Sequence, residues 1–168
     1  MYFCYLHAYV DNFGVRTSMK TKKMPKEELD GLMNAVLPFA QKMLSEHQEF
    51  YPFGSAITTN DEIIDIGAVD TDEHPPSQKL IHMMTKSFQE KAKSGEYRAT
   101  AIVFDVRVTV PSTGKKSDAI AIDLDHVNGM CVEVLLPYEI DSKGKVTYGE
   151  MFAQKCSVKI FNLQNRGN

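Results

Sequence analysis

The sequence has no tryptophan, only three cysteines and no long apolar run, and the last two of these features each exclude a class of protein. No stretch approaches the roughly 18 apolar residues of a membrane-spanning helix, and the first residues lack the basic and apolar regions of a signal peptide. The formal charge of -3 gives no electrostatic reason to bind nucleic acid or anionic lipid. We therefore expect a soluble, cytoplasmic protein that binds neither nucleic acid nor a membrane.

The three cysteines, Cys4, Cys131 and Cys156, are too few and too widely spaced for a disulfide framework. None belongs to a CxxC pair, so neither a zinc site nor a dithiol redox motif is indicated. We predict three reduced, structurally silent thiols. The sequence indicates no cofactor.

The size and composition are those of one globular domain. The chain has 168 residues, of which 43% are hydrophobic and 24% charged. That length suffices to bury roughly two-thirds of the unfolded surface. We see no internal repeat or linker, so we predict a single α+β domain over residues 1–168.

Helical periodicity begins at Pro25 and recurs to residue 44, although Pro38 should kink this helix or split it in two. Two strand-like runs, 53–58 and 62–69, follow as a hairpin. The clearest helix then covers about 75–93 and ends at a glycine.

The rest of the chain reads as a β-meander, with glycine in the turns between strands. The expected strands are 97–110, 118–125, 130–140, 146–152 and 157–161. We therefore predict an α+β two-layer sandwich, an antiparallel meander sheet with two main helices packed on it, in the order helix, hairpin, helix, meander.

Alternation of side chains along the meander gives the first candidate site. If the bulky faces of the strands coincide, the opposite face carries small alanines around Asp105, Arg107, Asp123 and Glu133. Such a face could bind a divalent cation or a cationic ligand through its carboxylates. The alternative is a solvated face with weak cross-strand ion pairs, which we favour because antiparallel sheets often leave one face wet.

The junction before the second predicted helix gives the second candidate site. Asp70, Asp72 and His74 lie within five positions and could ligate a metal, although the glycine and distal glutamate of a calcium loop are missing. Acids and proline are also typical of a helix N-terminus, and we favour that interpretation.

Three aromatic residues and a glycine lie close together in residues 49–54. They could line a small-molecule pocket, but we favour an anchor between the first helix and the sheet.

Motifs for known chemistries are missing. The TGKKS stretch at 113–117 lacks the first glycine of a phosphate-binding loop, and we find no GxSxG, HExxH or GxGxxG pattern. Whether the protein is an enzyme therefore stays open.

Several segments together resemble a family of bacterial proteins of unknown function. They are EFYPFGSAI (49–57), DEHP (72–75), VFDVRVTVP (103–111), DAIAI (118–122), LLPYEI (135–140) and EMFAQ (150–154). The resemblance covers residues 26–161 and implies no activity or catalytic residue.

Two hypotheses for function remain. The first is a non-enzymatic binding or regulatory module of the immunity type, which recognises a partner protein or a second copy of itself through an exposed sheet edge. The second is a small metal-dependent enzyme that uses the acidic face, with Arg107 stabilising developing negative charge. We prefer the first because the sequence carries no catalytic signature.

Overall fold

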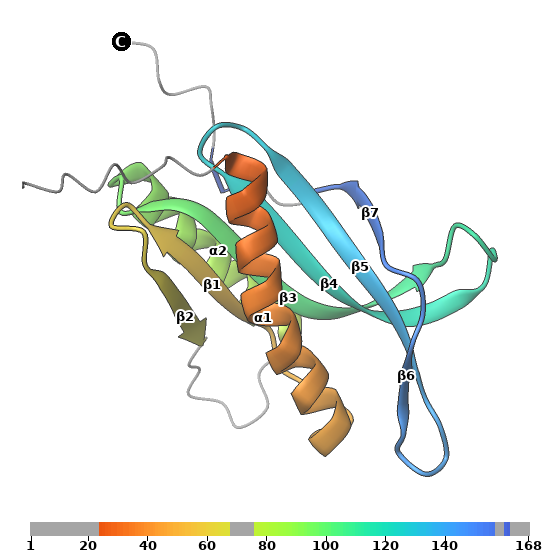
Figure 1. Cartoon of the computed structure of the whole chain (residues 1–168). Helices are drawn as coiled ribbons and strands as arrows, with labels where there is room; N and C mark the ends of the chain where they lie inside the picture. Colours follow the sequence, from red (N-terminus) through yellow and green to blue (C-terminus); the bar gives the residue numbers. More distant parts are fainter. Residues whose placement is uncertain (1–23, 68–75, 157–159, 162–168) are drawn as a thin grey trace, which may run out of the picture.

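The structure, a computed structural model, describes residues 24–67, 76–156 and 160–161 (Figure 1). In chain order its elements are α1 (Pro25–His47), β1 (Phe53–Thr58), β2 (Ile63–Gly67), α2 (Ser77–Lys93), β3 (Tyr97–Thr109), β4 (Lys116–His126), β5 (Cys131–Ile140), β6 (Val146–Tyr148) and β7 (Phe152–Lys155). The predicted α+β class and the order helix, hairpin, helix, meander are confirmed.

The strands form one seven-stranded antiparallel sheet in the order β2-β1-β3-β4-β5-β6. β7 also pairs with β5, next to the stretch that pairs with β6. The sheet thus has β2 at one edge and the two short strands β6 and β7 at the other. The strand expected at 146–152 is shorter, and the one expected at 157–161 lies mostly outside the described residues.

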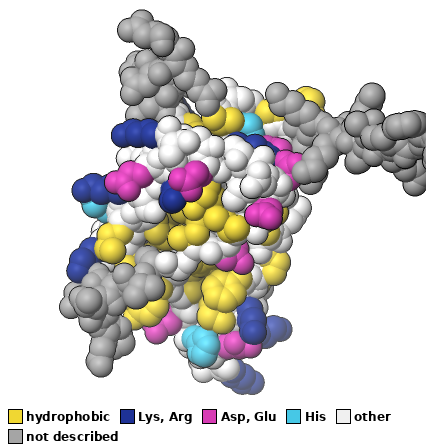
Figure 2. Space-filling model, turned by 90° about the vertical axis from the view of Figure 1, so that its left-hand side faces the viewer, with side chains coloured by type: hydrophobic (Ala, Val, Ile, Leu, Met, Phe, Trp, Pro, Cys, Tyr) yellow, Lys and Arg dark blue, Asp and Glu magenta, His cyan; other side chains and the backbone are white. Residues whose placement is uncertain are grey.

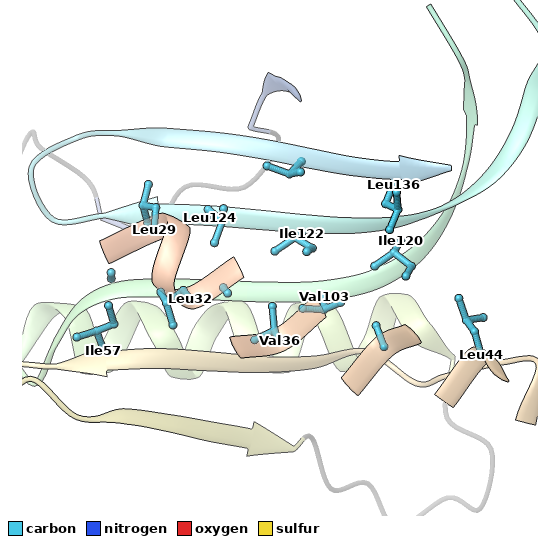
Figure 3. Close-up of a cluster of buried hydrophobic side chains, with 14 of the residues drawn as sticks. Leu29, Leu32, Val36, Leu44, Ile57, Val103, Ile120, Ile122, Leu124 and Leu136 are labelled. Atoms are coloured by element: carbon cyan, nitrogen blue, oxygen red, sulfur yellow. The ribbon is translucent and has the colours of Figure 1, made fainter. Parts of the chain in front are cut away.

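Helix α1 covers one face of the sheet. Its buried side chains recur every three or four residues, at Leu29, Leu32, Val36, Ala40 and Leu44, which is the spacing of one helix face. Figure 3 shows several of them directed at side chains of β3, β4 and β5. The helix is continuous through the exposed Pro38, so the predicted split does not occur.

Helix α2 lies on the opposite face of the sheet from α1, behind β1 and β3 in the view of Figure 1. Met84 and Phe88 contact Ile102 of β3, whereas the next residue, Val103, belongs to the core beneath α1. Successive residues of a strand point to opposite faces. The two helices therefore cover opposite faces of the sheet. The arrangement has three layers, where the sequence predicted two.

Phe88 depends on a glycine in the strand beneath it. A Cβ atom at Gly54 would lie 2.7 Å from Phe88 Cζ and 3.0 Å from the carbonyl oxygen of Ala101. Phe88 is fully buried, so its ring has little room to move. The absence of a side chain at Gly54 lets α2 approach the sheet.

The aromatic residues around this glycine anchor α1 to β1. The ring of Phe53 lies edge-on to that of Phe39 in α1, with centroids 4.9 Å apart, and to that of Phe50 at 6.2 Å. The predicted anchor between helix and sheet is confirmed for Phe50 and Phe53, whereas Tyr51 is 45% exposed.

No helix in the described ranges is long and apolar enough to cross a membrane.

Candidate functional site

Asp105 and Arg107 lie on the α1 face of the sheet. Asp105 pairs across the ladder with Ile120, a member of the α1 core, and Arg107 pairs with Asp118. The Tyr138 hydroxyl donates a 2.8 Å hydrogen bond to Asp105, and Arg107 Nη1 donates one of 2.8 Å to Asp118. Burial raises the pKa of Asp105, although the hydrogen bond from Tyr138 opposes that shift. The exposed Arg107–Asp118 pair contributes little to stability.

Asp123 and Glu133 lie on the other face, which α2 partly covers. They stand directly opposite each other on β4 and β5 and are only 4% and 6% exposed. Asp123 also pairs with Ile102, which places both acids on the α2 side. Gln154 of β7 donates a side-chain hydrogen bond to Glu133.

The prediction that these four residues share one face is therefore wrong. It assumed that the bulky faces of neighbouring strands coincide, but bulky residues of one strand stand opposite small residues of the next. Phe104 of β3 faces Ala121 of β4, and Leu124 of β4 faces Ala101 of β3. Large and small side chains alternate across the ladder, which lets both helices pack closely. Asp105 and Arg107 are thus separated by the sheet from Asp123 and Glu133.

In the ranges that the structure covers, no group of three or more histidine, cysteine, aspartate or glutamate side chains is arranged to hold a metal. The hypothesis of a metal-dependent enzyme needs these four charged residues on one face, and the sheet separates Asp105 and Arg107 from the other two. The hypothesis therefore has no geometric support. Asp70, Asp72 and His74 lie outside the described residues, so a metal site at that junction stays a prediction.

A polar cluster that the sequence did not indicate joins α1 to the sheet, and Glu28 and His126 at its centre are buried. We call it the Glu28 cluster, and it consists of Glu28, Asp61, Arg98, His126 and Asn128. Arg98 donates to both carboxylate oxygens of Glu28, through Nε at 3.1 and 3.0 Å and through Nη2 at 2.8 Å. His126 Nε2 lies 2.8 Å from Glu28 Oε2, and its Nδ1 lies 2.8 Å from Asn128 Oδ1.

The Glu28 cluster connects four parts of the chain. Arg98 Nη1 also contacts the Thr58 carbonyl at 2.8 Å and Asp61 Oδ1 at 2.6 Å, so the cluster joins α1, the β1–β2 turn, β3 and the β4–β5 turn. Burial raises the pKa of Glu28, but the hydrogen bonds from Arg98 and His126 outweigh that effect and the pKa is lowered. These contacts bind the cluster's charged groups to one another, so we interpret it as a structural clamp rather than a ligand site.

Cys131 and Cys156 form a disulfide, with their Cα atoms 5.6 Å apart. The prediction of three reduced thiols is therefore wrong for this pair. The reason is the register of β5 with β7. Val132 pairs with Lys155, and one position further along the ladder Cys131 stands opposite Cys156. A separation of 25 residues gave no local signal of this pairing.

Strand β2 leaves one side of its backbone unpaired by any strand in the described part of the chain. Its side chains are half-exposed or exposed, and Ile63 is 48% exposed. Figure 2 views the molecule from the side on which β2 lies in Figure 1. It shows hydrophobic side chains gathered in the middle of this face, with acidic side chains beside them.

Comparisons of the chain with known protein families, with curated proteins and with solved structures returned no match. The resemblance to a bacterial family therefore stays a prediction.

Proposed function

We propose that this protein is a non-enzymatic binding module that captures an extended segment of a partner protein as an additional strand beside β2. The observation that carries the proposal is the outer edge of β2, where a row of backbone donors and acceptors lies next to half-exposed apolar side chains. Such an edge is a template for strand addition, in which main-chain hydrogen bonds supply affinity and alternate side chains supply specificity.

The ladder determines which groups of β2 are available. The Thr58 N–H donates to the Glu62 carbonyl at 2.9 Å, and hydrogen-bonded pairs then alternate along an antiparallel ladder. The backbone N–H and C=O groups of Ile64 and Ile66 therefore form hydrogen bonds with β1. The Ser55 hydroxyl also donates to the Ile64 carbonyl. The N–H and C=O groups of Ile63, Asp65 and Gly67 consequently point away from β1.

The side chains of β2 define the chemistry of the partner. Ile64 and Ile66 lie on the α2 side, whereas the exposed Asp65 lies on the α1 side. From Thr58 to Gly67 the chain carries three acidic residues and no lysine or arginine. A complementary strand therefore has a basic residue opposite Asp65 and apolar residues on either side of it.

The same aspartate disfavours a second copy of this chain as the occupant. The antiparallel register that uses all five residues of β2 would place Asp65 directly beside Asp65 of the second copy. Like charges directly opposite each other destabilise a ladder. We therefore favour a different protein over the homo-oligomer.

The opposite edge of the sheet is a poorer template. β6 and β7 are separated by residues 149–151, where the Gly149 N–H turns to the Pro137 carbonyl. Short, interrupted edge strands resist pairing with another chain.

The Cys131–Cys156 disulfide indicates the kind of compartment in which the protein functions. Disulfides persist in oxidising compartments and are rare in the cytoplasm. We therefore propose that this protein functions in an oxidising compartment, in place of the cytoplasmic location expected from the sequence.

Isothermal calorimetry with a capped peptide of alternating valine and lysine tests the proposal. We expect the wild type to bind this peptide and to reject a matched peptide that carries glutamate in place of lysine. Asp65→Ala keeps the outward N–H and should bind more weakly, whereas Asp65→Pro removes that donor and should abolish binding. Proline is tolerated at an edge position whose N–H faces solvent, so this variant should fold. Equal binding by wild type and Asp65→Pro, or no binding of the basic peptide, would refute the proposal.

A further inference from the structure

We infer that the Cys131–Cys156 disulfide is a redox-controlled latch that holds Ile160 and Phe161 against the apolar cluster beneath α2. The inference does not depend on the proposed strand addition. It rests on a covalent tie, an adjacent polar tie and a buried apolar contact, all on the same face of the sheet.

The covalent tie lies on the α2 face. Cys131 pairs across the ladder with Asp125, and Asp125 pairs on its other side with Thr100. These positions alternate with Leu124 and Val132, which pack beneath α1. The disulfide therefore joins the first residue of β5 to the residue that follows β7, on the side of the sheet that carries α2.

The polar tie is the carboxylate of Asp125, the ladder neighbour of Cys131. Its Oδ2 accepts hydrogen bonds from the backbone N–H groups of Ile160 at 2.6 Å and Phe161 at 3.1 Å. Asp125 is only 4% exposed, and hydrogen bonds to a buried carboxylate are stronger than those between neutral groups. The disulfide thus holds the chain at Cys156, and Asp125 holds it again four and five residues later, at Ile160 and Phe161.

The apolar contact is what the two ties maintain. Ile160 and Phe161 are 5% and 8% exposed and belong to one cluster with Met84, Phe88 and Ile102. Neither residue belongs to a helix or strand of the described part of the chain. Two side chains outside any helix or strand are easily released unless the chain beside them is fixed.

The chemical step is a two-electron exchange with a dithiol reductant. One thiolate of the reductant attacks a sulfur of the Cys131–Cys156 bond and forms a mixed disulfide. The second thiolate then closes the reductant's own disulfide, and Cys131 and Cys156 each take up a proton as free thiols. Reduction removes the covalent tie at Cys156, so the chain is then held only by the β5–β7 ladder up to Lys155 and by the hydrogen bonds to Asp125. Local opening at Ile160 and Phe161 becomes more frequent and exposes Met84 and Ile102.

Hydrogen exchange of the Ile160 and Phe161 amides, followed by NMR in the full-length protein, tests the latch. We expect slow exchange in the oxidised protein and an increase of at least about tenfold at both amides after reduction with a dithiol. The Cys156→Ser variant should show the same increase without a reductant, and Cys4→Ser, which leaves the disulfide intact, should behave as the wild type. A thiol count after unfolding should give one thiol in the oxidised protein and three in the reduced one.

The amide of Ile122 in the centre of the sheet is the internal reference. An increase at Ile160 and Phe161 with unchanged exchange at Ile122 supports a local latch. Unchanged exchange at the two amides in a protein that shows three thiols would overturn it. An equal increase at Ile122 would also overturn it, because the disulfide would then stabilise the whole domain. If Cys156→Ser does not fold, reduction of the wild type gives the same measurement.

Discussion

His126 Nε2 lies 2.8 Å from Glu28 Oε2, although the two residues are 98 positions apart in the sequence. Arg98 approaches the same carboxylate from a third segment. The first turn of α1 is thereby fixed to the beginning of β3 and the end of β4. Because the Glu28 carboxylate is 7% exposed, it needs both partners to offset the cost of its burial.

We predict that Glu28→Gln lowers the free energy of unfolding by about 2–3 kcal/mol near neutral pH. Arg98, whose side chain is largely buried, then loses its buried carboxylate partner and keeps only the exposed Asp61 as a counter-charge. The pKa of Glu28 is lowered in the folded protein from the ordinary 4.5. Its contribution is therefore present above pH 4.5 and is lost as the pH falls from there through the lower folded pKa. Urea denaturation of both proteins at several pH values measures the difference, which should narrow below pH 4.5.

Asp30→Asn is the matched control for this prediction, since Asp30 is an exposed acid two positions further along the same helix. Its stability should stay within about 0.5 kcal/mol of the wild type across the same pH range. A difference between Glu28→Gln and wild type that stays constant down to pH 3 would show that the ionised carboxylate contributes nothing.

The close approach of Gly54 and Phe88 predicts a coupled pair of substitutions. Gly54→Ala should destabilise the protein by about 1–3 kcal/mol because the new Cβ overlaps the Phe88 ring, and Phe88→Ala by about 3–5 kcal/mol because the ring is fully buried. In the Phe88→Ala background Gly54→Ala should cost clearly less, because one of its two close contacts is gone. Equilibrium denaturation of the four proteins completes the cycle, and strictly additive effects would contradict this packing.

Much of the fold could be predicted because its signals are local. The apolar stripe of α1 and the alternating strands are readable within short windows. The opposite placement of α1 and α2 is not local, because it depends on which face of β3 each helix meets. The pairing of Phe104 with Ala121 shows why the face assignment failed. On each face of the sheet, large side chains of one strand lie beside small side chains of the next. The face that carries the large residues of one strand therefore does not predict which face carries those of its neighbour.

The candidate site was less predictable for the same reason. The Glu28 cluster and the Cys131–Cys156 disulfide depend on registers between segments that are far apart, and no short motif encodes such a register. The exposed edge could be anticipated from an open meander, but that β2 forms it follows from the pairing of β1 with β3.

The corrected faces predict which charged residues are energetically coupled. Tyr138→Phe and Asp105→Asn should be non-additive by about 0.5 kcal/mol or more, because the hydroxyl donates to that carboxyl group. Asp105→Asn and Asp123→Asn should be additive, since the two side chains point to opposite faces of the sheet. Denaturation of the single and double variants measures both cycles. Strong coupling between Asp105 and Asp123 would restore the single acidic face and contradict the register.

If the outward backbone groups of β2 accept another strand, amide hydrogen exchange measured by NMR should report the new hydrogen bonds one residue at a time. In the free protein the amides of Ile63 and Asp65 should exchange rapidly, whereas those of Ile64 and Ile66, which bond to β1, should exchange slowly. Addition of the valine–lysine peptide should slow exchange at Ile63 and Asp65 and leave Ile64 and Ile66 unchanged. Exchange at Ile63 and Asp65 that stays rapid in the presence of saturating peptide would show that no strand is added beside β2.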